Sequence, residues 1–313
     1  MFALLDQTTT EPAARARATA ATPAELDDLA DRFGSLYRTA DPATLLTPVA
    51  AHVRMVSDAL TREQNPDDRR RLLRNRARVA ILAGRLAGDD LGDSMSARAY
   101  YALAVDSATE AGHHALAAIA HCYAAELAAA EHLTAAALDH LAAADQHAQH
   151  APAIRSWLAT IEATVHADRG DHQTAAEALT RAQDAYDRST TDATLAWFED
   201  DQTARLTAAT GHLQLRSGTH TAARASYAEA IAQLHPTDRR HRVQCLIGQA
   251  TAELHAGDPG VACRLAAQAA DLLGRTPYAT GTASLRAFRA TAERPLGTRA
   301  LRALDQQLAH LAA

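Results

Sequence analysis

The chain has 313 residues, of which 48% are hydrophobic and only 4% aromatic, and it carries a formal net charge of −6 at pH 7. The negative charge excludes a nucleic-acid-binding polyelectrolyte, and the hydrophobic content suffices for a buried core or one long helical array. No stretch reaches the roughly 18 apolar residues of a membrane helix, and three widely spaced cysteines favour a reducing cytoplasm over a disulfide framework.

The N-terminal part predicts a tail followed by two capped helices. Residues 1–22 contain a threonine run and few large apolar residues, which predicts a linker or disordered tail. Thr22-Pro23-Ala24-Glu25 predicts a helix start, because threonine is a good N-cap and proline is favourable at the first helical position. Asp41-Pro42 predicts a second start, with a helix running to about Leu60.

Apolar residues at helical spacing continue through the rest of the chain, and no period-two alternation predicts a strand. Helices are expected at about 67–87, 93–111, 113–129, 131–149, 152–169, 171–188, 198–217, 219–234, 239–256, 258–274, 281–293 and 296–312.

A turn followed by small side chains at fixed spacing recurs five times. The clearest copy has Ala97, Tyr101 and Ala104 after Gly92-Asp93. The second turn residues of the five copies lie at 93, 131, 171, 219 and 258. The weakest copy follows Ala130-Glu131 and has Ala135, Asp139 and Ala142 at the three positions. A recurring period of this size predicts stacked helix pairs.

This pattern resembles the second helix of a tetratricopeptide repeat, in which small residues lie where two helices cross and a larger one fills the gap. The best matches are Gly92, Ala97, Tyr101, Ala104, Gly218, Ala223, Tyr227 and Ala230. The larger residue is Leu179, Ala266 or Asp139 in the other copies, and the spacing exceeds the 34 residues of that family. The resemblance is therefore to a degenerate version with longer helices.

Residues 29–42, residues 91–101 and Trp197-Phe198-Glu199 carry a second resemblance, which covers about 23–290. They are similar to the tetratricopeptide-like C-terminal region of actinobacterial regulators whose N-terminus is an Xre-type helix-turn-helix. The resemblance implies a ligand- or peptide-responsive regulator of development or secondary metabolism. No helix-turn-helix fits into the first 22 residues, so DNA binding is not carried over. A regulator fragment and a stand-alone sensor or adaptor both remain open.

The expected fold is all-α: a right-handed α-solenoid of tetratricopeptide-like helix-turn-helix pairs over residues 23–313. The repeats are expected at about 67–111, 113–149, 152–188, 198–234 and 239–274. The first helix of each pair is expected to line a concave face, where repeat proteins bind peptides or helices. The longest interval contains an insertion at 189–200 that carries Trp197 and Phe198. These aromatic residues either line a pocket or plug the gap left by the longer connection, and we favour the plug.

Arginines crowd the helix expected at 67–87, and all 31 basic residues of the chain are arginine. The cluster consists of Arg69, Arg70, Arg71, Arg74, Arg76, Arg78 and Arg85. Arg71, Arg78 and Arg85 share a helix face. Guanidinium groups bind carboxylates and phosphates, so the cluster is either an anchor for an acidic ligand group or a solvated face paired with acids such as Asp67 and Asp68. Because surface charge runs are common, we favour the solvated face.

Histidines crowd the middle of the chain. They are His113, His114, His121, His132, His140, His147 and His150. Imidazoles at such spacing can bind zinc or copper, but no HExxH pattern or cysteine pair accompanies them. We favour solvated or partly buried histidines and expect no metal and no cofactor.

No catalytic motif is convincing, and we expect no enzyme. The sequence has no nucleotide-binding glycine loop and no hydrolase elbow. His121 and Cys122 are adjacent on a helix and point apart, so they are not a nucleophile–base pair. The acidic pair Asp89-Asp90 lies at a turn, where acids cap the next helix.

The function hypothesis is a cytoplasmic sensor that binds a peptide or small molecule and relays this to a protein partner. It makes no direct contact with nucleic acid or membrane. The candidate ligand-binding residues, all on expected first helices, are Arg74, Arg78, Trp157, Arg205, His212 and Gln244. Two alternatives stay open. One is a scaffold without a small ligand, with a homodimer as one option. The other is the sensory half of a DNA-binding regulator whose helix-turn-helix is absent from this chain.

Overall fold

The computed structural model describes residues 21–37, 39–189, 202–292 and 298–310. All regular secondary structure in these ranges is helical, which confirms the all-α prediction. The first half contains α1 (Pro23–Leu36), α2 (Pro42–Leu60), α3 (Pro66–Arg85), the π-helical turn η1 (Leu86–Asp90), α4 (Ser94–Glu110), α5 (His114–Ala130), α6 (Thr134–His147), α7 (Pro152–Asp168) and α8 (His172–Asp187). The second half contains α10 (Gln202–Arg216), α11 (His220–Gln233), α12 (Arg239–His255), α13 (Pro259–Arg275), α14 (Ala279–Thr291) and α15 (Thr298–His310).

Some of the sequence-based expectations fall outside the described ranges. The proposed tail lies almost entirely in residues 1–20, and Trp197 and Phe198 lie in residues 190–201. In the part of the chain that the structure describes, no helix combines the length and apolarity needed to cross a bilayer.

Side-chain caps begin the helices where the sequence predicts them. Thr22 forms a capping box with Glu25 at the start of α1. Asp41 caps α2 by accepting a hydrogen bond from the Thr44 backbone N–H at 2.8 Å. Both helices continue with proline at a first-turn position, where its missing N–H costs no intrahelical bond. The two predicted starts are therefore confirmed.

Residues with positive φ fix the register of the repeats and correct one of them. Gly92, Gly170, Gly218 and Gly257 adopt φ between 72° and 90°, and each is followed by the N-cap residue of a helix. In the weak copy the equivalent residue is His132, with φ 60°. The N-cap of α6 is therefore Leu133, two residues later than Glu131.

This register changes which residues of the weak copy pack inside. Ala137, Leu141 and Ala144 are buried at the three positions after Leu133. The expected set of Ala135, Asp139 and Ala142 is exposed instead. Leu141, and not an aspartate, occupies the large position, so this copy is as apolar as the others. The expectation failed because a histidine takes the left-handed turn position, where glycine marks the other copies.

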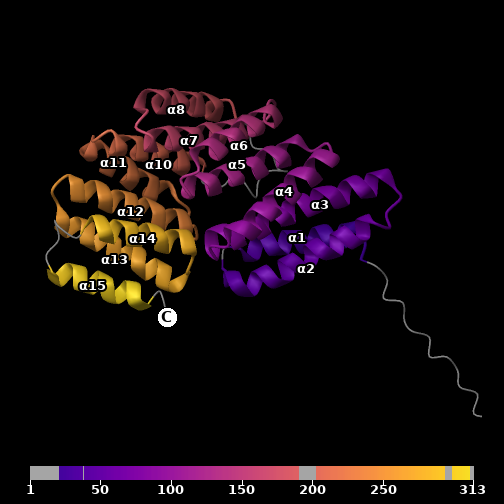
Figure 1. Cartoon of the computed structure of the whole chain (residues 1–313), viewed down its shortest axis with the longest axis horizontal. Coiled ribbons are helices and arrows are strands. Elements are labelled where there is room, and N and C mark those ends of the chain that lie inside the picture. The colour runs from indigo at the N-terminus through magenta and orange to yellow at the C-terminus, as the bar shows by residue number, and fades with distance from the viewer. Residues whose placement is uncertain (1–20, 38, 190–201, 293–297, 311–313) are drawn as a thin grey trace, which may run out of the picture.

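Consecutive helices pack as pairs, and the first helices of the pairs also pack on one another. The pairs are α3 with α4, α5 with α6, α7 with α8, α10 with α11, and α12 with α13. The first helices are in contact in the order α3, α5, α7, α10, α12 and α14. They form a continuous layer of a curved array, whose N-terminal and C-terminal ends turn toward each other (Figure 1).

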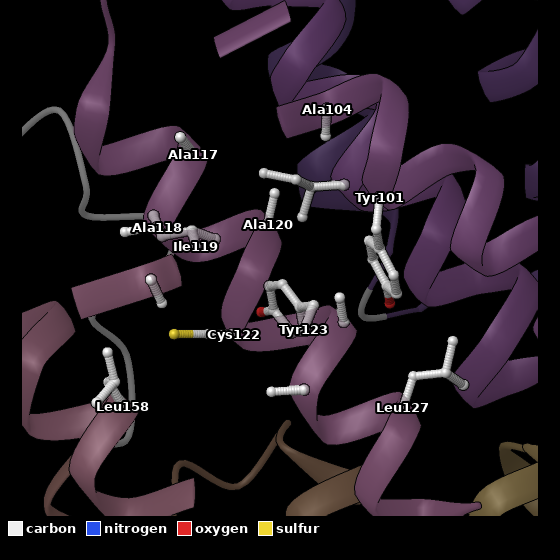
Figure 2. Packing of buried hydrophobic residues seen from close by; sticks show 14 of the residues in the cluster. Tyr101, Ala104, Ala117, Ala118, Ile119, Ala120, Cys122, Tyr123, Leu127 and Leu158 are labelled. Atoms are coloured by element: carbon white, nitrogen blue, oxygen red, sulfur yellow. The ribbon is translucent and has the colours of Figure 1, made fainter. Parts of the chain in front are cut away.

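The pairs are joined by buried alanines and a few large rings. Tyr101 of α4 stacks on Tyr123 of α5, with ring centroids 6.1 Å apart and an interplanar angle of 12° (Figure 2). Gly84 of α3 provides the room, because a Cβ there would lie 2.4 Å from Tyr101 Cε1. Alanine and glycine thus set the close helix approach, and each tyrosine fills one gap.

The two ends of the array touch through residues far apart in sequence. Arg240 at the start of α12 donates from Nε to Asp90 Oδ1 at 2.7 Å, and from Nη1 to the Tyr37 carbonyl at 3.2 Å. Thr280 of α14 donates from Oγ1 to the Asp89 carbonyl at 3.1 Å. The array therefore closes on itself at the π-helical turn that ends α3.

Candidate ligand-binding site

A pocket of about 460 Å³ opens between the first helices of successive pairs. Its walls come mainly from α5, α7, α10 and α12. Trp157, Arg205, His212 and Gln244 all line it, so four of the six candidate residues lie around one space. They share this space because the sequence placed them on first helices, and those helices form one layer of the array.

Trp157 lies at the polar end of this pocket, where its ring is held by contacts with its neighbours. Its Nε1–H donates to Glu126 Oε1 at 3.0 Å, which fixes the ring. Its ring meets that of Tyr123 edge-on, with centroids 4.8 Å apart. The Arg205 guanidinium lies over the Trp157 ring, 5.5 Å from its centroid. An aromatic ring next to a cation is suited to a ligand that has both an apolar and an anionic part.

The remaining wall is apolar and closely packed. Tyr227 lies against Gly248, where a Cβ would come within 2.4 Å of Tyr227 Cζ. Ile161, Leu215 and Ile247 complete this side. Cys245 also lines it, but burial raises the pKa of its thiol to about 12, so it stays protonated and is no nucleophile at neutral pH. Cys245 is therefore a buried part of the pocket wall.

A second space, a cleft of about 960 Å³, lies between α1, α3 and the start of α12. It shares Arg205 and His241 with the pocket, so the two spaces adjoin. Arg78 lines the cleft and forms an ion pair with Asp31 at 2.5 Å. Arg74 is exposed and lines neither space, which leaves it without contact to the pocket that holds the other candidates.

Most arginines of α3 are paired with acids, as the solvated-face interpretation expects. The ion pairs are Arg69–Glu110, Arg70–Asp67, Arg71–Asp27 and Arg78–Asp31. Arg85 is different. Among the described residues it forms no ion pair, and its guanidinium lies 4.3 Å from the Tyr37 ring centroid and 4.9 Å from that of Tyr123.

The acidic pair Asp89-Asp90 does not cap the next helix, contrary to the expectation. Asp93 is the cap of α4 and accepts from the Ser96 N–H at 3.0 Å. The Asp90 side chain has no exposed surface and receives Arg240 instead. Burial raises the pKa of Asp90, and the Arg240 guanidinium opposes that rise. No local pattern marks this role, because its partner is 150 positions away in sequence.

Four histidines form a row between α5 and α6. His114 and His147 approach with Nδ1 atoms 3.2 Å apart, and His121 and His140 with Nδ1 atoms 3.3 Å apart. The rings of His121 and His147 stack with centroids 6.0 Å apart. Burial and the neighbouring His140 and His147 lower the pKa of His121 to about 4. Within the described ranges, no three histidine, cysteine or acidic side chains are placed to hold a metal ion.

This row predicts loss of stability in acid. The unfolded state takes up a proton at His121 below pH 6.5, whereas the folded state does so only near pH 4, so the free energy of unfolding falls as pH decreases between these values. His121→Gln is expected to reduce the loss between pH 7 and pH 5 by about 1 kcal/mol, after allowance for partial exposure. Urea unfolding at both pH values measures it, with exposed His150→Gln as control. An equal loss in both variants would contradict the assignment.

No protein-family model and no curated protein sequence matches this chain.

Proposed function

We propose that this chain is a cytoplasmic, tetratricopeptide-like sensor that binds a peptide or small molecule on the inner layer of its helices and acts through a protein partner. The observation that carries the proposal is the pocket formed by Trp157, Arg205, His212 and Gln244. Ligand pockets are concave, mostly apolar and supplied with a few fixed polar groups. We further propose that the helix pairs form a right-handed superhelix, as in tetratricopeptide arrays.

The contact between the two ends supports a regulatory role. Binding next to Arg205 and His241 touches residues that belong to both the pocket and the cleft, and Arg240, which joins the ends, immediately precedes His241 in α12. A ligand that prefers one arrangement of the ends shifts the population toward it and changes the surface offered to a partner. The resemblance to actinobacterial regulators suggests a role in transcriptional control of development or secondary metabolism.

The binding step can be tested with an uncharged aromatic probe. Phenylnaphthylamine, whose fluorescence rises in apolar surroundings, is expected to bind the full chain saturably at one site. Ala208 lines the pocket, and Ala208→Phe fills part of it. This variant is expected to lower probe affinity at least tenfold, a loss of about 1.4 kcal/mol or more.

The matched control is Ala176→Phe on α8, because Ala176 is exposed and lines neither the pocket nor the cleft. It is expected to bind the probe like the unmodified chain. Far-UV circular dichroism checks that both variants fold. Absence of saturable binding, or equal affinity in the two variants, would contradict a ligand site here and favour a scaffold that acts only through protein contacts.

A further inference from the structure

Two arginines of the cleft, on α3 and α10, form no ion pair and no side-chain hydrogen bond among the described residues. The aspartates and arginines that line the cleft are Asp31, Arg78, Arg85, Arg205, Asp238, Arg239 and Arg240. Its five arginines exceed its two aspartates, although the whole chain is negative. Arg78 pairs with Asp31, Arg240 with Asp90, and Arg239 donates to Thr276. Arg85 and Arg205 form no ion pair and no hydrogen bond within the described part of the chain.

Aromatic rings hold these two cations in place and leave their N–H groups available. Arg85 lies between Tyr37 and Tyr123, and Arg205 lies over Trp157. The Nε atoms of both arginines are buried without a hydrogen-bond partner among the described residues. A buried, unsatisfied donor is costly and rare, and a guanidinium stacked on a ring still directs its N–H groups within its own plane.

The two guanidiniums flank one pair of rings. Tyr123, which Arg85 contacts, meets the ring of Trp157 with centroids 4.8 Å apart, and Trp157 carries Arg205. Arg205 and His241 line both the apolar pocket and the polar cleft. Both arginines therefore line one cleft, and Arg205 marks the place where this cleft adjoins the apolar pocket.

Three acids lie near these two arginines, and none of them forms an ion pair with either arginine within the described part of the chain. Glu126 accepts the hydrogen bond from Trp157, and Asp90 is used by Arg240. Asp89 is the remaining neighbour, and burial raises the pKa of its carboxyl to about 7 against the opposing effect of Arg85.

We propose that the ligand is a small amphiphilic anion, with its carboxylate, phosphate or sulfonate group bound by Arg85 and Arg205 and its apolar body in the pocket between Trp157 and Tyr227. This inference rests on the proposed ligand-binding function and specifies its chemistry. Charge-assisted hydrogen bonds from guanidinium to an oxyanion are among the strongest polar contacts in proteins. The opposite face of such a ligand meets the apolar wall of Ile161 and Ile247.

The test compares two probes that differ in one anionic group. Anilinonaphthalene sulfonate and uncharged phenylnaphthylamine are titrated into the full chain, Arg85→Gln, Arg205→Gln and Arg70→Gln. Arg70 is exposed and pairs with Asp67, so its variant controls for a lost surface charge. We expect each of the first two variants to weaken sulfonate binding at least tenfold more than it weakens phenylnaphthylamine binding. Arg70→Gln should change neither affinity.

The outcomes separate this inference from the proposed function. Sulfonate affinity that is equal in all four proteins, with phenylnaphthylamine still bound, would overturn the anion site and leave the ligand pocket standing. Absence of binding by both probes would overturn both. Arg85→Gln also removes the cation–π contacts with Tyr37 and Tyr123, so far-UV circular dichroism checks that this variant folds. Arg205→Gln lies on a different helix and tests the anion site independently.

Competition with the bound sulfonate probe identifies the source of the anion. Dodecanoate represents a small lipophilic acid, and an apolar pentapeptide with a free C-terminus represents a peptide carboxylate. Each is compared with its uncharged counterpart, dodecanol or the peptide amide. Displacement by either acid but not by its counterpart supports the inference, and equal displacement by acid and counterpart contradicts it.

Discussion

Replacing Arg240 with methionine is expected to lower the free energy of unfolding by about 3–5 kcal/mol. The guanidinium donates to Asp90 Oδ1 at 2.7 Å, and the Asp90 side chain has no exposed surface. Methionine keeps the length of the side chain but leaves the carboxylate buried without this cation. Removal of one member of a buried pair costs far more than loss of an exposed ion pair, because the remaining charge is not solvated. Urea denaturation at pH 7 measures the effect.

The neighbouring residue provides the control. Arg239 is exposed and its guanidinium donates to the uncharged Thr276 Oγ1, so Arg239→Met is expected to cost less than about 1 kcal/mol. Adding Asp90→Asn to Arg240→Met should recover stability relative to the sum of the two single variants, since both charges are then absent. If Arg240→Met costs no more than Arg239→Met, the ends of the array are not joined by this pair.

Gly84→Ala is expected to cost about 1–3 kcal/mol or more, because the added methyl group overpacks the core. A Cβ at this position would lie 2.4 Å from Tyr101 Cε1 and 2.7 Å from Tyr101 Cδ1. The ring cannot move aside easily, since Tyr101 is only 2% exposed and stacks on Tyr123. The thermal midpoint and urea unfolding report the loss.

At another helical glycine, substitution by alanine is expected to raise stability instead of lowering it. Gly274 near the end of α13 is exposed and has no atom within 4 Å of an added Cβ, so Gly274→Ala should stabilise the chain by up to about 1 kcal/mol through helix propensity. Combining Gly84→Ala with Tyr101→Leu should cost less than the sum of the two changes. A neutral or stabilising Gly84→Ala would show that α3 and α4 do not approach as closely as described.

The helices themselves were predictable, because their signals are local. Thr22 and Asp41 mark helix starts through their capping chemistry, and turn glycines with positive φ mark the ends of first helices. The local signal is weaker in the second repeat, and the sequence therefore predicts its turn two residues too early. His132 occupies the left-handed position there, and a histidine carries no turn signal comparable to glycine.

The site was only partly predictable. The sequence places four of the candidate residues on first helices, and these helices pack on one another. This packing brings Trp157, Arg205, His212 and Gln244 to one pocket. Arg85 was included in the arginine cluster but could not be singled out. Its face is shared with Arg71 and Arg78, and only the packing of α1 shows that those two meet aspartates whereas Arg85 meets Tyr37. Long-range pairing of this kind leaves no trace in local spacing.

Ligand binding in the pocket beside Trp157 can be observed directly at its indole N–H. The chain has two tryptophans, so Trp197→Phe leaves the Trp157 indole N–H as the sole resonance of its type in a nitrogen-15 correlation spectrum. This N–H donates to Glu126, and we expect its resonance to shift saturably as phenylnaphthylamine is added, reaching its end point at one probe per chain. Ala208→Phe in the same background should abolish the shift. Probe binding that leaves the Trp157 resonance unmoved would show that the ligand binds elsewhere and would contradict a ligand site in this pocket.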